Sequence, residues 1–348
     1  MRQARLVEAG RVEIEEVPRP EPGPGRVLLA PEWVGVCGTD VHVWHDKHPF
    51  TTLPVVQGHE VSATVVEAGP GVEGWVPGDR VVVEPSLVCR HLRPDRPPCP
   101  QCRAGRYNIC DHLRVMGFQA PGCYAEYYAV PEDRLVRLPD GLAMDMAAFA
   151  EPVAVGVHAC RRVGVEKGAR VLVVGAGPIG LLLAQSAKAM GAGEVLAADI
   201  RDNRLDLARR FGLDHTVNSE RDPLPQAVRA VWPDGPDAVF EVVGFEPAMR
   251  DAILSARKGT RIGVVGVFGD DPALQMSLVQ DRELELIGTL MYMKPDWETA
   301  VRFLADGAVQ VLPLVTHRFE MADLAKAYRQ IDGAPEETLK VLVEVRRD

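Results

Sequence analysis

The stretch VLVVGAGPIG, residues 171–180, decides the fold of the second half of the chain. Its first four residues form a continuous apolar run, as expected of a parallel strand buried on both faces. In the glycines that follow, Gly175 permits a tight turn, Gly177 lets the backbone approach a ligand closely, and Gly180 lets a helix pack against the strand. The stretch therefore predicts a buried strand, a glycine-rich turn and the start of a helix.

The residues after this turn continue to alternate between strand and helix patterns, which predicts an α/β fold with a doubly wound parallel sheet. Asp199 lies 19 residues beyond Gly180, where the second strand should end. A carboxylate at that place can accept hydrogen bonds from both ribose hydroxyls of a dinucleotide. We expect helices over 179–190, 204–211 and 247–256, and strands over 194–198, 215–217, 238–243 and 261–265.

The turn is a candidate cofactor site, because the N-terminus of a helix offers free N–H groups to phosphates. A carboxylate at position 199 would repel a 2′-phosphate and favours NAD over NADP. Arg201 and Arg204 leave that choice open, since they could hold such a phosphate or lie in solvent. An ordinary strand–helix turn is the alternative. The candidate cofactor-binding residues are Gly175, Gly177, Pro178, Ile179, Gly180, Asp199 and Arg204.

Residues 1 to about 147 have a different pattern. Short apolar runs such as Val27–Ala30, Val61–Val66 and Arg80–Val83 alternate with loops rich in Gly and Pro, so we expect a β-rich domain. Residues 339–345 again resemble a strand, and we expect this tail to rejoin the first domain. A chain of 348 residues is too long for one ordinary core. We predict one domain over 1–150 and 288–348 and another over 151–287.

The bulk composition excludes several classes of protein. Lys and Arg number 39 against 49 Asp and Glu, and the net charge of −10 disfavours nucleic acid as a partner. No apolar run approaches the ~18 residues that span a membrane. The first 16 residues alternate like a strand and do not resemble a signal peptide. We therefore expect a cytoplasmic globular protein without a nucleic-acid or membrane partner.

Two segments of the β-rich domain contain candidate metal ligands. Cys37 lies in GVCGTDVH, residues 35–42, and His59 and Glu60 lie in GHE, residues 58–60. A thiolate, an imidazole and a carboxylate together suit Zn²⁺, and three protein ligands leave one position open for water or substrate. A lone cysteine in an apolar strand is usually part of the core. The joint presence of all three beside a dinucleotide domain indicates a catalytic zinc.

Four of the seven cysteines lie in one short stretch, at Cys89, Cys99, Cys102 and Cys110. Without a secretion signal, such clustering favours a metal over disulfides. Structural zinc is four-coordinate, so Cys89 is the candidate for the fourth place beside the other three. The intervening residues 90–98 contain three prolines and can loop out at small entropic cost. The alternative is a lobe that has lost its metal, with Cys89 as a buried thiol.

The chain resembles the zinc-containing medium-chain dehydrogenases, and is similar to their sorbitol (polyol) and butanediol dehydrogenase branch. The resemblance implies a GroES-like catalytic domain, a Rossmann domain, zinc and NAD as cofactors, and a homotetramer or homodimer. It covers nearly the whole chain. It is carried by CGTDVH at 37–42, GHE at 58–60, CRAGRYNIC at 102–110, EPVAV at 151–155, GAGPIG at 175–180 and PLVTHRF at 313–319.

The resemblance also implies roles for the candidate metal ligands. Cys37 and His59 match the catalytic zinc ligands of the family. Glu60 matches the third ligand of the polyol enzymes, or a carboxylate just behind the metal. Glu151 matches a residue that holds the metal-bound water or ligates directly. Asp40 matches a partner that fixes the tautomer of His59.

Two further residues match a proton relay. Thr39 resembles the hydroxyl that takes the substrate proton, and His42 resembles the surface end of the relay. The sequence also departs from the pattern of the family. Arg96 stands where the first lobe cysteine usually lies. Met291, before the matching aromatic Tyr292, stands where sorbitol dehydrogenases often have an arginine. The second departure favours a smaller or less polar diol.

These observations predict NAD-linked oxidation of a secondary alcohol in a polyol or vicinal diol. An L-threonine 3-dehydrogenase or a sugar or sugar-acid dehydrogenase would share the motifs and stays open. A quinone-reductase-like or crystallin-like protein on the same scaffold would lack the zinc ligands. In a non-catalytic zinc and nucleotide sensor, the relay from Thr39 to His42 would have no purpose.

Overall fold

The computed structural model describes residues 1–345, and these form two compact units. Gln185 ties residues 306–313 to the second unit, because its side chain donates to Gln310 O at 3.1 Å and accepts from Gln310 N at 2.8 Å. The sequence had placed those residues in the first domain. The first unit contains Met1–Glu151, Met293–Ala305 and the chain from Leu314 onward, and the second contains Pro152–Tyr292 and Asp306–Pro313.

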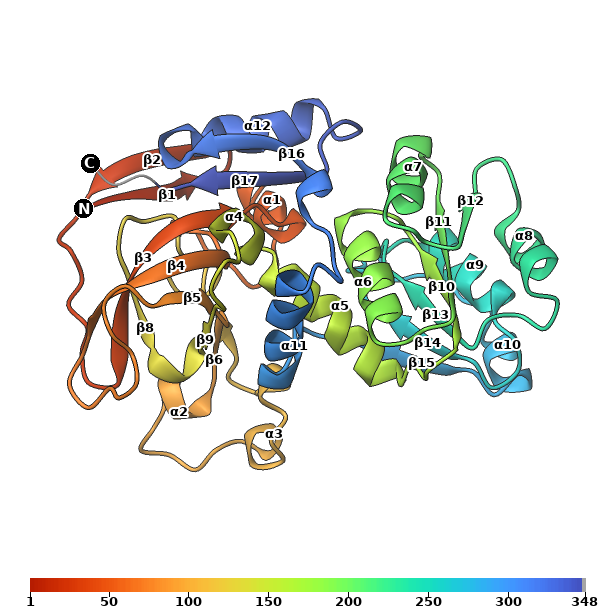
Figure 1. Ribbon diagram of the computed structural model, residues 1–348, viewed down its shortest axis with the longest axis horizontal. Coiled ribbons are helices and arrows are strands. Elements are labelled where there is room, and N and C mark those ends of the chain that lie inside the picture. The colour runs from red at the N-terminus through yellow and green to blue at the C-terminus, as the bar shows by residue number, and fades with distance from the viewer. Residues whose placement is uncertain (346–348) are drawn as a thin grey trace. The chain divides into compact units, whose positions relative to one another are not determined.

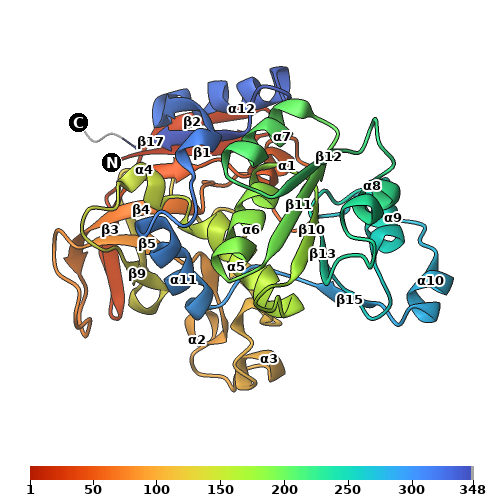
Figure 2. The ribbon, with the colours of Figure 1, turned by 45° about the vertical axis from the view of Figure 1, so that its right-hand side comes forward.

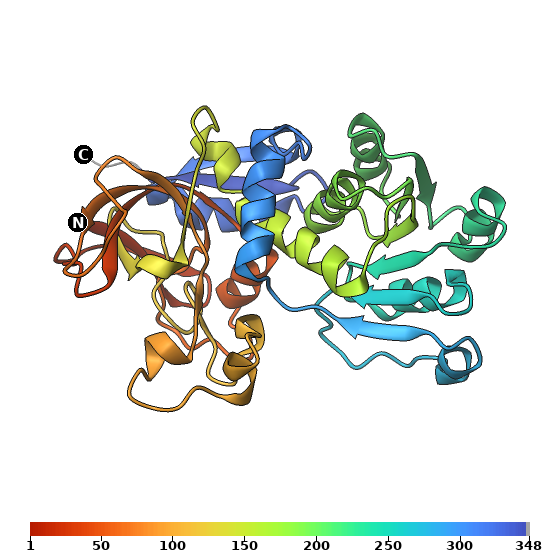
Figure 3. The same cartoon turned by 60° about the horizontal axis from the view of Figure 1, so that its bottom comes forward.

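The second unit is built on a six-stranded sheet with the order β12-β11-β10-β13-β14-β15, in which every neighbouring pair is parallel (Figure 1). The order reverses beside β10, which is the arrangement of a doubly wound dinucleotide fold and confirms the predicted fold class. Figure 3 shows β15 at the edge of this sheet. The strands are β10 (Arg170–Val174), β11 (Glu194–Asp199), β12 (His215–Asn218), β13 (Ala238–Glu241), β14 (Arg261–Val264) and β15 (Glu285–Gly288).

Helices cover both faces of this sheet, as Figure 2 shows for α6 on one side and α8 and α9 on the other. Leu172 and Val174 of β10 pack in one cluster with residues of α8 and α9. Val173, between them, faces α6, where a Cβ on Gly180 would lie 3.6 Å from its side chain. The helices are α6 (Pro178–Ala189), α7 (Asp202–Arg210), α8 (Leu224–Val231), α9 (Glu246–Ser255) and α10 (Met276–Asp281).

The first unit is β-rich, as predicted. Its main sheet has the order β16-β17-β3-β4-β5-β9, with β8 also paired to β3, and β1 and β2 form a separate hairpin. The C-terminal β17 runs antiparallel to β3, so the tail of the chain completes the sheet that the N-terminal half begins. The strands are β1 (Arg2–Glu8), β2 (Arg11–Glu16), β3 (Arg26–Gly35), β4 (Glu60–Ala68), β5 (Arg80–Val83), β8 (Tyr128–Pro131), β9 (Leu135–Arg137), β16 (Val315–Glu320) and β17 (Lys340–Glu344).

The helices of the first unit are short. Trp44, at the end of α1, stacks on Tyr328 of α12 with ring centroids 5.0 Å apart, which fixes α1 against the C-terminal helix. Among residues 1–345, no helix has the length and apolar character needed to cross a membrane. The helices are α1 (Gly38–Trp44), α4 (Met144–Ala147), α11 (Lys294–Ala305) and α12 (Leu324–Gly333), and α5 (Ala150–Val163) leads into the second unit.

A small lobe protrudes from the first unit at α2 and α3 (Figure 1). It lies between β6 and β7, which pair antiparallel and close the segment at its base. Its core consists of the four clustered cysteines and Val88, with Tyr107 and Leu113 packed against them. The elements are β6 (Ser86–Leu87), α2 (Cys89–Leu92), α3 (Pro100–Arg103) and β7 (Arg114–Val115).

Candidate metal and nucleotide sites

The pairing of β3 with β4 brings the first candidate metal ligands together. Gly35, near the end of β3, is paired with Glu60 at the start of β4. Cys37 lies two residues after the end of β3 and is the N-cap of α1, while His59 directly precedes β4. One ligand atom each from Cys37, His59 and Glu60 lie within 4.8 Å of one another. Residues that are 22 positions apart in the chain therefore form one cluster.

Acidic side chains in and beside the cluster suit a cation. Burial by itself lowers the pKa of His59, but Asp40 and Cys37 raise it, and the net result is a pKa well above the ordinary value. Asp40 Oδ1 lies 3.5 Å from His59 Nδ1. His59 and Glu60 are buried, whereas Cys37 is half-buried, so the cluster is open on the side of the thiol. The donor set and its surroundings thus fit a zinc ion with one accessible position.

Glu60 has a cationic partner that sequence reasoning missed. Lys340 of β17 is 5% exposed and donates from Nζ to Glu60 Oε1 at 2.6 Å and to Val36 O at 3.0 Å. Burial lowers the pKa of Lys340, but Glu60 and Cys37 raise it, and the net shift is upward. A Cβ on Gly35 would lie 2.0 Å from Glu60 Oε2, so a glycine is needed beneath this carboxylate.

A buried chain of hydrogen bonds supports Asp40. The Cys37 N–H donates to Asp40 Oδ2 at 3.0 Å, and Gln57 Nε2 donates to Asp40 O at 3.1 Å. The hydroxyl of Tyr328 in turn donates to Gln57 Oε1 at 2.9 Å. Sequence reasoning missed Gln57 and Tyr328, although Gln57 directly precedes the GHE motif. These hydrogen bonds link the candidate metal cluster to α12, which lies about 270 residues downstream of Gln57.

The candidate relay residues lie on α1. Thr39 is half-buried, and its Oγ1 lies 3.7 Å from Cys37 Sγ. His42, in the last turn of the helix, is exposed. Residues three apart on a helix share a face, so the two side chains can lie in line from the cluster to the surface.

Glu151 lies in the first turn of α5 and is 8% exposed. It is not part of the three-residue ligand cluster. Its charge also raises the pKa of Lys340.

The lobe brings its four cysteines together. One sulfur each from Cys89, Cys99, Cys102 and Cys110 lie within 4.8 Å of one another, and all four residues are buried. Cys110 Sγ lies 3.6 Å from the sulfur of Cys89 and 3.8 Å from that of Cys99. All four are free thiols. Four convergent, unbridged sulfurs fit a closed tetrahedral zinc site.

Backbone N–H groups stabilise these sulfurs. The N–H of Cys99 donates to Cys89 Sγ, that of Cys102 to Cys99 Sγ, and that of His112 to Cys110 Sγ, each at 3.4 Å. Such donors favour thiolates, the form that binds metal. Burial opposes ionisation of Cys99, but hydrogen bonds from the backbone of Cys102 and Asp111 and from the thiols of Cys102 and Cys89 lower its pKa to about 6. Burial raises the pKa values of Cys102 and Cys110.

A buried ion pair anchors the lobe to the main sheet. Arg134, 3% exposed, donates to Glu84 Oε1 at 2.7 Å just before β6. Asp133 accepts from His91 of α2 at 3.0 Å. Arg90 also pairs with Asp133, at 2.6 Å. Side chains of α2 are thereby fixed to the segment that leads into β9.

The glycine-rich turn of the second unit has the local geometry that the sequence predicts. Gly175 has a φ of 107°, and a Cβ on Gly180 would lie 1.8 Å from Gly175 O. Pro178 opens α6 at its first turn. A side chain would not fit at Gly175 or Gly180, so glycine permits the tight turn and the close packing of α6, while residues 177–179 are half-buried at the carboxyl edge of the sheet.

Asp199 is fixed at the end of β11. Its Oδ2 accepts from the Ala176 N–H at 2.8 Å, and its Oδ1 accepts from the Arg201 N–H at 3.0 Å. Arg204 Nη1 lies 3.3 Å from Asp199 Oδ2 and 3.9 Å from the position of a Cβ on Gly177. Asp199 and Arg204 are therefore brought to the turn together, while Arg201 contributes a backbone donor.

A second buried carboxylate at this edge was missed. Glu241 at the end of β13 is fully buried, and its Oε1 accepts from the N–H groups of Val243 and Gly244, each at 2.8 Å. Burial raises the pKa of Glu241. It holds the turn after β13, opposite Val174 of β10. A single acid in an apolar run is the signal that could have indicated it.

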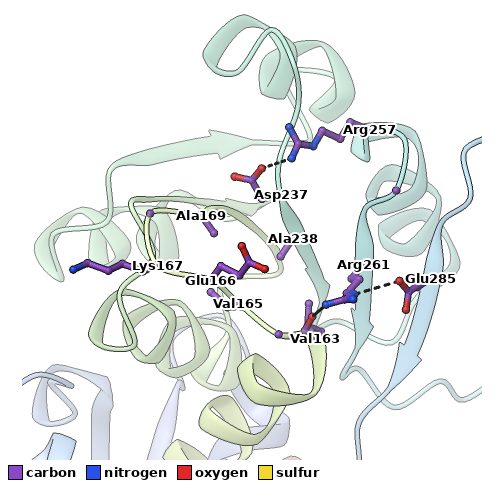
Figure 4. A pocket seen from close by; sticks show the side chains of 13 residues that line it. Val163, Val165, Glu166, Lys167, Ala169, Asp237, Ala238, Arg257, Arg261 and Glu285 are labelled. Carbon is purple, nitrogen blue, oxygen red and sulfur yellow. Dashed lines mark hydrogen bonds and ion pairs between the residues drawn. The ribbon is translucent and has the colours of Figure 1, made fainter.

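The second unit also has a polar cavity of about 400 Å³ at the opposite, amino edge of the sheet (Figure 4). Its two arginines already have acidic partners: Arg257 pairs with Asp237, and Arg261 lies 3.2 Å from Glu285. The glycine-rich turn lies at the carboxyl edge, so this cavity is separate from the candidate nucleotide site.

Comparisons with known proteins identify the family of the chain. The alcohol dehydrogenase GroES-like domain matches residues 23–140, and the zinc-binding dehydrogenase domain matches residues 178–306. Sorbitol dehydrogenase 1 of Saccharomyces cerevisiae is 36% identical over 339 residues, which cover 93% of this chain and 92% of the relative. The chain belongs to the zinc-binding alcohol dehydrogenase family.

Solved structures of the family resemble the whole chain. A protein of Sinorhizobium meliloti, described as a zinc-binding dehydrogenase bound to NADP, is 31% identical with a TM-score of 0.91, covering 99% of this chain and 98% of the other. The 2R,3R-butanediol dehydrogenase of Bacillus subtilis is 28% identical with a TM-score of 0.90, covering 99% of both chains. The chain is thus a zinc-dependent dehydrogenase that uses a nicotinamide cofactor, close to the sorbitol branch of its family.

Proposed function

We propose that this dehydrogenase oxidises a secondary alcohol of a vicinal diol or small polyol to a ketone, and reduces the ketone in the reverse direction. The observation that carries the proposal is the cluster of Cys37, His59 and Glu60, which combines three donor types with one accessible side. The similarity of the whole chain to sorbitol and butanediol dehydrogenases supports a polyol or vicinal diol as the substrate. Met291, where a sorbitol dehydrogenase often has an arginine, favours the less polar substrates.

In this proposal Cys37, His59 and Glu60 would hold the catalytic zinc, which would supply a Lewis acid that lowers the pKa of the substrate hydroxyl. Thr39 accepts the hydroxyl proton, and the exposed His42 passes it to solvent. Asp40 orients His59. Glu151 would hold a water at the metal site or ligate the zinc directly.

Lys340 balances the charge of Glu60 behind the proposed site. Because both oxygens of Glu60 face this ammonium group, a metal ion must compete with Lys340 for the carboxylate. The pair therefore sets how strongly Glu60 binds a cation, a role that none of the sequence motifs indicates.

We propose NAD as the preferred cofactor, bound at the glycine-rich turn through Gly175, Gly177, Pro178, Ile179 and Gly180. The carboxylate of Asp199, held by two backbone N–H groups, supports this choice because it would repel a 2′-phosphate. Arg204 is drawn to Asp199 and would pair with such a phosphate once the carboxylate is removed. In Asp199→Ala, the ratio of kcat/KM with NADP to that with NAD should rise about tenfold or more, since hydrogen bonds to charged groups contribute about 1.5–3 kcal/mol.

We further propose that Cys89, Cys99, Cys102 and Cys110 hold a structural zinc. Reduced thiols are typical of the cytoplasm, and we propose that compartment for this chain. The net charge of −10 supports a small-molecule substrate and disfavours nucleic acid. A homotetramer or homodimer is proposed from the resemblance to the polyol enzymes.

The decisive experiment measures initial rates with NAD and NADP across sorbitol, 2,3-butanediol, 2-butanol, L-threonine and sugar acids. The proposal expects the highest kcat/KM with a vicinal diol or polyol, and loss of that activity when zinc is removed by a chelator. Higher kcat/KM with L-threonine or a sugar acid would assign the chain to those activities. Turnover that is unaffected by complete removal of zinc would contradict the mechanism.

A further inference from the structure

His48 belongs to none of the motifs but packs on a ring that contacts the proposed metal site. Its ring stacks on Phe118, with centroids 5.2 Å apart and planes 17° from parallel. Phe118 in turn packs against His59, with centroids 4.9 Å apart. His48 is half-buried, whereas Phe118 and His59 are buried. A single aromatic ring therefore separates His48 from a proposed zinc ligand.

The hydrogen bonds of His48 define its tautomer. The Phe50 N–H donates to His48 Nδ1 at 3.3 Å, and the Thr51 hydroxyl lies 2.7 Å from the same nitrogen. A backbone N–H can only donate, so Nδ1 carries a lone pair and the ring proton is on Nε2. Burial and the neighbouring His42 lower the pKa of His48, which keeps the ring neutral. Within residues 1–345, no hydrogen-bond partner is found for Nε2.

The loop that carries His48 is held in place although its tip is exposed. Gln119 Nε2 donates to Phe50 O at 3.2 Å, and Gln119 Oε1 accepts from the Val115 N–H at 2.9 Å. Thr51 is 8% exposed. Because one ring edge of His48 is bonded within the loop and one ring face is packed on Phe118, the direction of the Nε2–H is fixed relative to the metal cluster.

We propose that His48 determines substrate specificity by donating its Nε2–H to a second hydroxyl, the one next to the reacting carbinol. This inference rests on the proposed function and narrows it. A single neutral donor suits a hydroxyl oxygen, whereas a carboxylate or phosphate group is usually recognised by a cation. The second hydroxyl of a vicinal diol thus has a partner that a monoalcohol lacks, and the substrate is a neutral diol or polyol rather than an acid.

The test compares 2,3-butanediol with 2-butanol, which lacks only the second hydroxyl, in two variants. His48→Phe keeps a ring against Phe118 but removes the donor. We expect its kcat/KM to fall about fivefold to tenfold for the diol and to stay within about twofold for 2-butanol, as for the loss of one hydrogen bond. His48→Gln keeps a donor and should recover part of the preference for the diol. Equal changes for both substrates in His48→Phe would overturn the proposal.

His45 provides the matched control. It lies three residues earlier, is exposed, and pairs with Asp332 at 2.9 Å, so His45→Phe should leave the ratio of the two substrates unchanged. Zinc content and Tm of the His48 variants report whether the fold persists. If the wild-type enzyme oxidised no alcohol of the panel, the proposed function would fail by itself.

A nitrogen NMR experiment tests His48 independently of turnover. Long-range ¹H–¹⁵N spectra of the holoenzyme should show His48 as the Nε2–H tautomer. Adding 2,3-butanediol to the NADH-bound enzyme, which cannot oxidise it, should shift the Nε2 resonance, and 2-butanol should not. A proton on Nδ1, or equal shifts with both alcohols, would contradict the inference.

Discussion

The two candidate metal sites of this chain differ in their donor atoms and in the groups that support them. The cluster of Cys37, His59 and Glu60 combines three donor types, keeps a half-buried thiol, and has charged side chains behind it. The lobe uses sulfur alone, is buried throughout, and is stabilised mainly by backbone N–H groups. A closed four-sulfur site suits a structural metal, whereas three mixed ligands with an open side suit catalysis.

The supports of the two sites differ in the same way. Behind the proposed catalytic cluster, Lys340 and Asp40 supply one positive and one negative charge, so the affinity for a cation and the protonation of His59 can be tuned. In the lobe the donors to the sulfurs are backbone N–H groups, which change only if the lobe unfolds. Substitutions in the cluster should therefore alter chemistry first, and substitutions in the lobe should alter stability first.

The largest effect is expected from Cys37→Ser. Loss of this ligand should remove one zinc per chain and nearly all turnover, because a metal contributes several kcal/mol of charge stabilisation in such reactions. Zinc analysis and initial rates measure both. Cys160→Ala, which alters a buried cysteine outside both clusters, should keep full zinc content and activity. A Cys37→Ser enzyme with wild-type turnover would remove the distinction between the two sites.

Thr39→Val tests whether the open cluster uses a proton relay. General acid–base catalysis typically contributes about 10²- to 10⁴-fold, so kcat should fall by a factor in that range while the Kd for NAD stays nearly unchanged. His42→Ala should lower kcat less, since bulk water can replace an exposed base. Stopped-flow rates and NAD titration provide the two measurements. Equal kcat in Thr39→Val and the wild type would refute the relay.

Cys89→Ala is the corresponding test of the lobe. We expect one zinc per chain to remain, Tm to fall, and residual activity to persist, because the catalytic cluster keeps its ligands. Arg96 provides a control: it occupies the usual place of the first lobe cysteine and is exposed, so Arg96→Ala should change neither zinc content nor Tm. A fully loaded wild-type enzyme with a single zinc per chain would show that the lobe holds no metal.

Features that depend on nearby residues could be predicted from the sequence, both at the glycine-rich turn and at the two candidate metal sites. The glycine-rich turn depends on residues 175–180 and the strand before it, so its geometry follows from nearby residues alone. The lobe cysteines lie within 22 residues, and their clustering could be read directly. Cys37, His59 and Glu60 could be predicted as ligands because their residue types suit zinc and because their motifs resemble those of the zinc-containing medium-chain dehydrogenases.

Side-chain contacts between distant segments could not be predicted, although the return of the C-terminal strand to the first domain was predicted. Lys340 reaches Glu60 because β17 pairs with β3, and a lone lysine in a terminal strand carries no sign of that partner. The same holds for Tyr328, which reaches Gln57 from α12. Residues 306–313 contact the second unit through Gln185, again a long-range contact. Hydrophobic periodicity identifies an element but not its distant partner.

Lys340→Met tests the charge behind the catalytic cluster, with the smallest expected effect on turnover. Removing one partner of a buried ion pair typically costs about 3–5 kcal/mol, because the other charge stays buried. The free energy of unfolding of the chelator-treated protein should therefore fall by about that amount. The zinc-loaded protein should lose less, since the metal supplies a replacement positive charge beside Glu60. Denaturant unfolding of both forms measures the difference.

Lys326→Met removes an exposed ion pair with Asp323 and should change the free energy of unfolding of either form by no more than about 1 kcal/mol. Equal destabilisation of the metal-free and zinc-loaded Lys340→Met proteins would show that the metal and Lys340 do not share the Glu60 carboxylate.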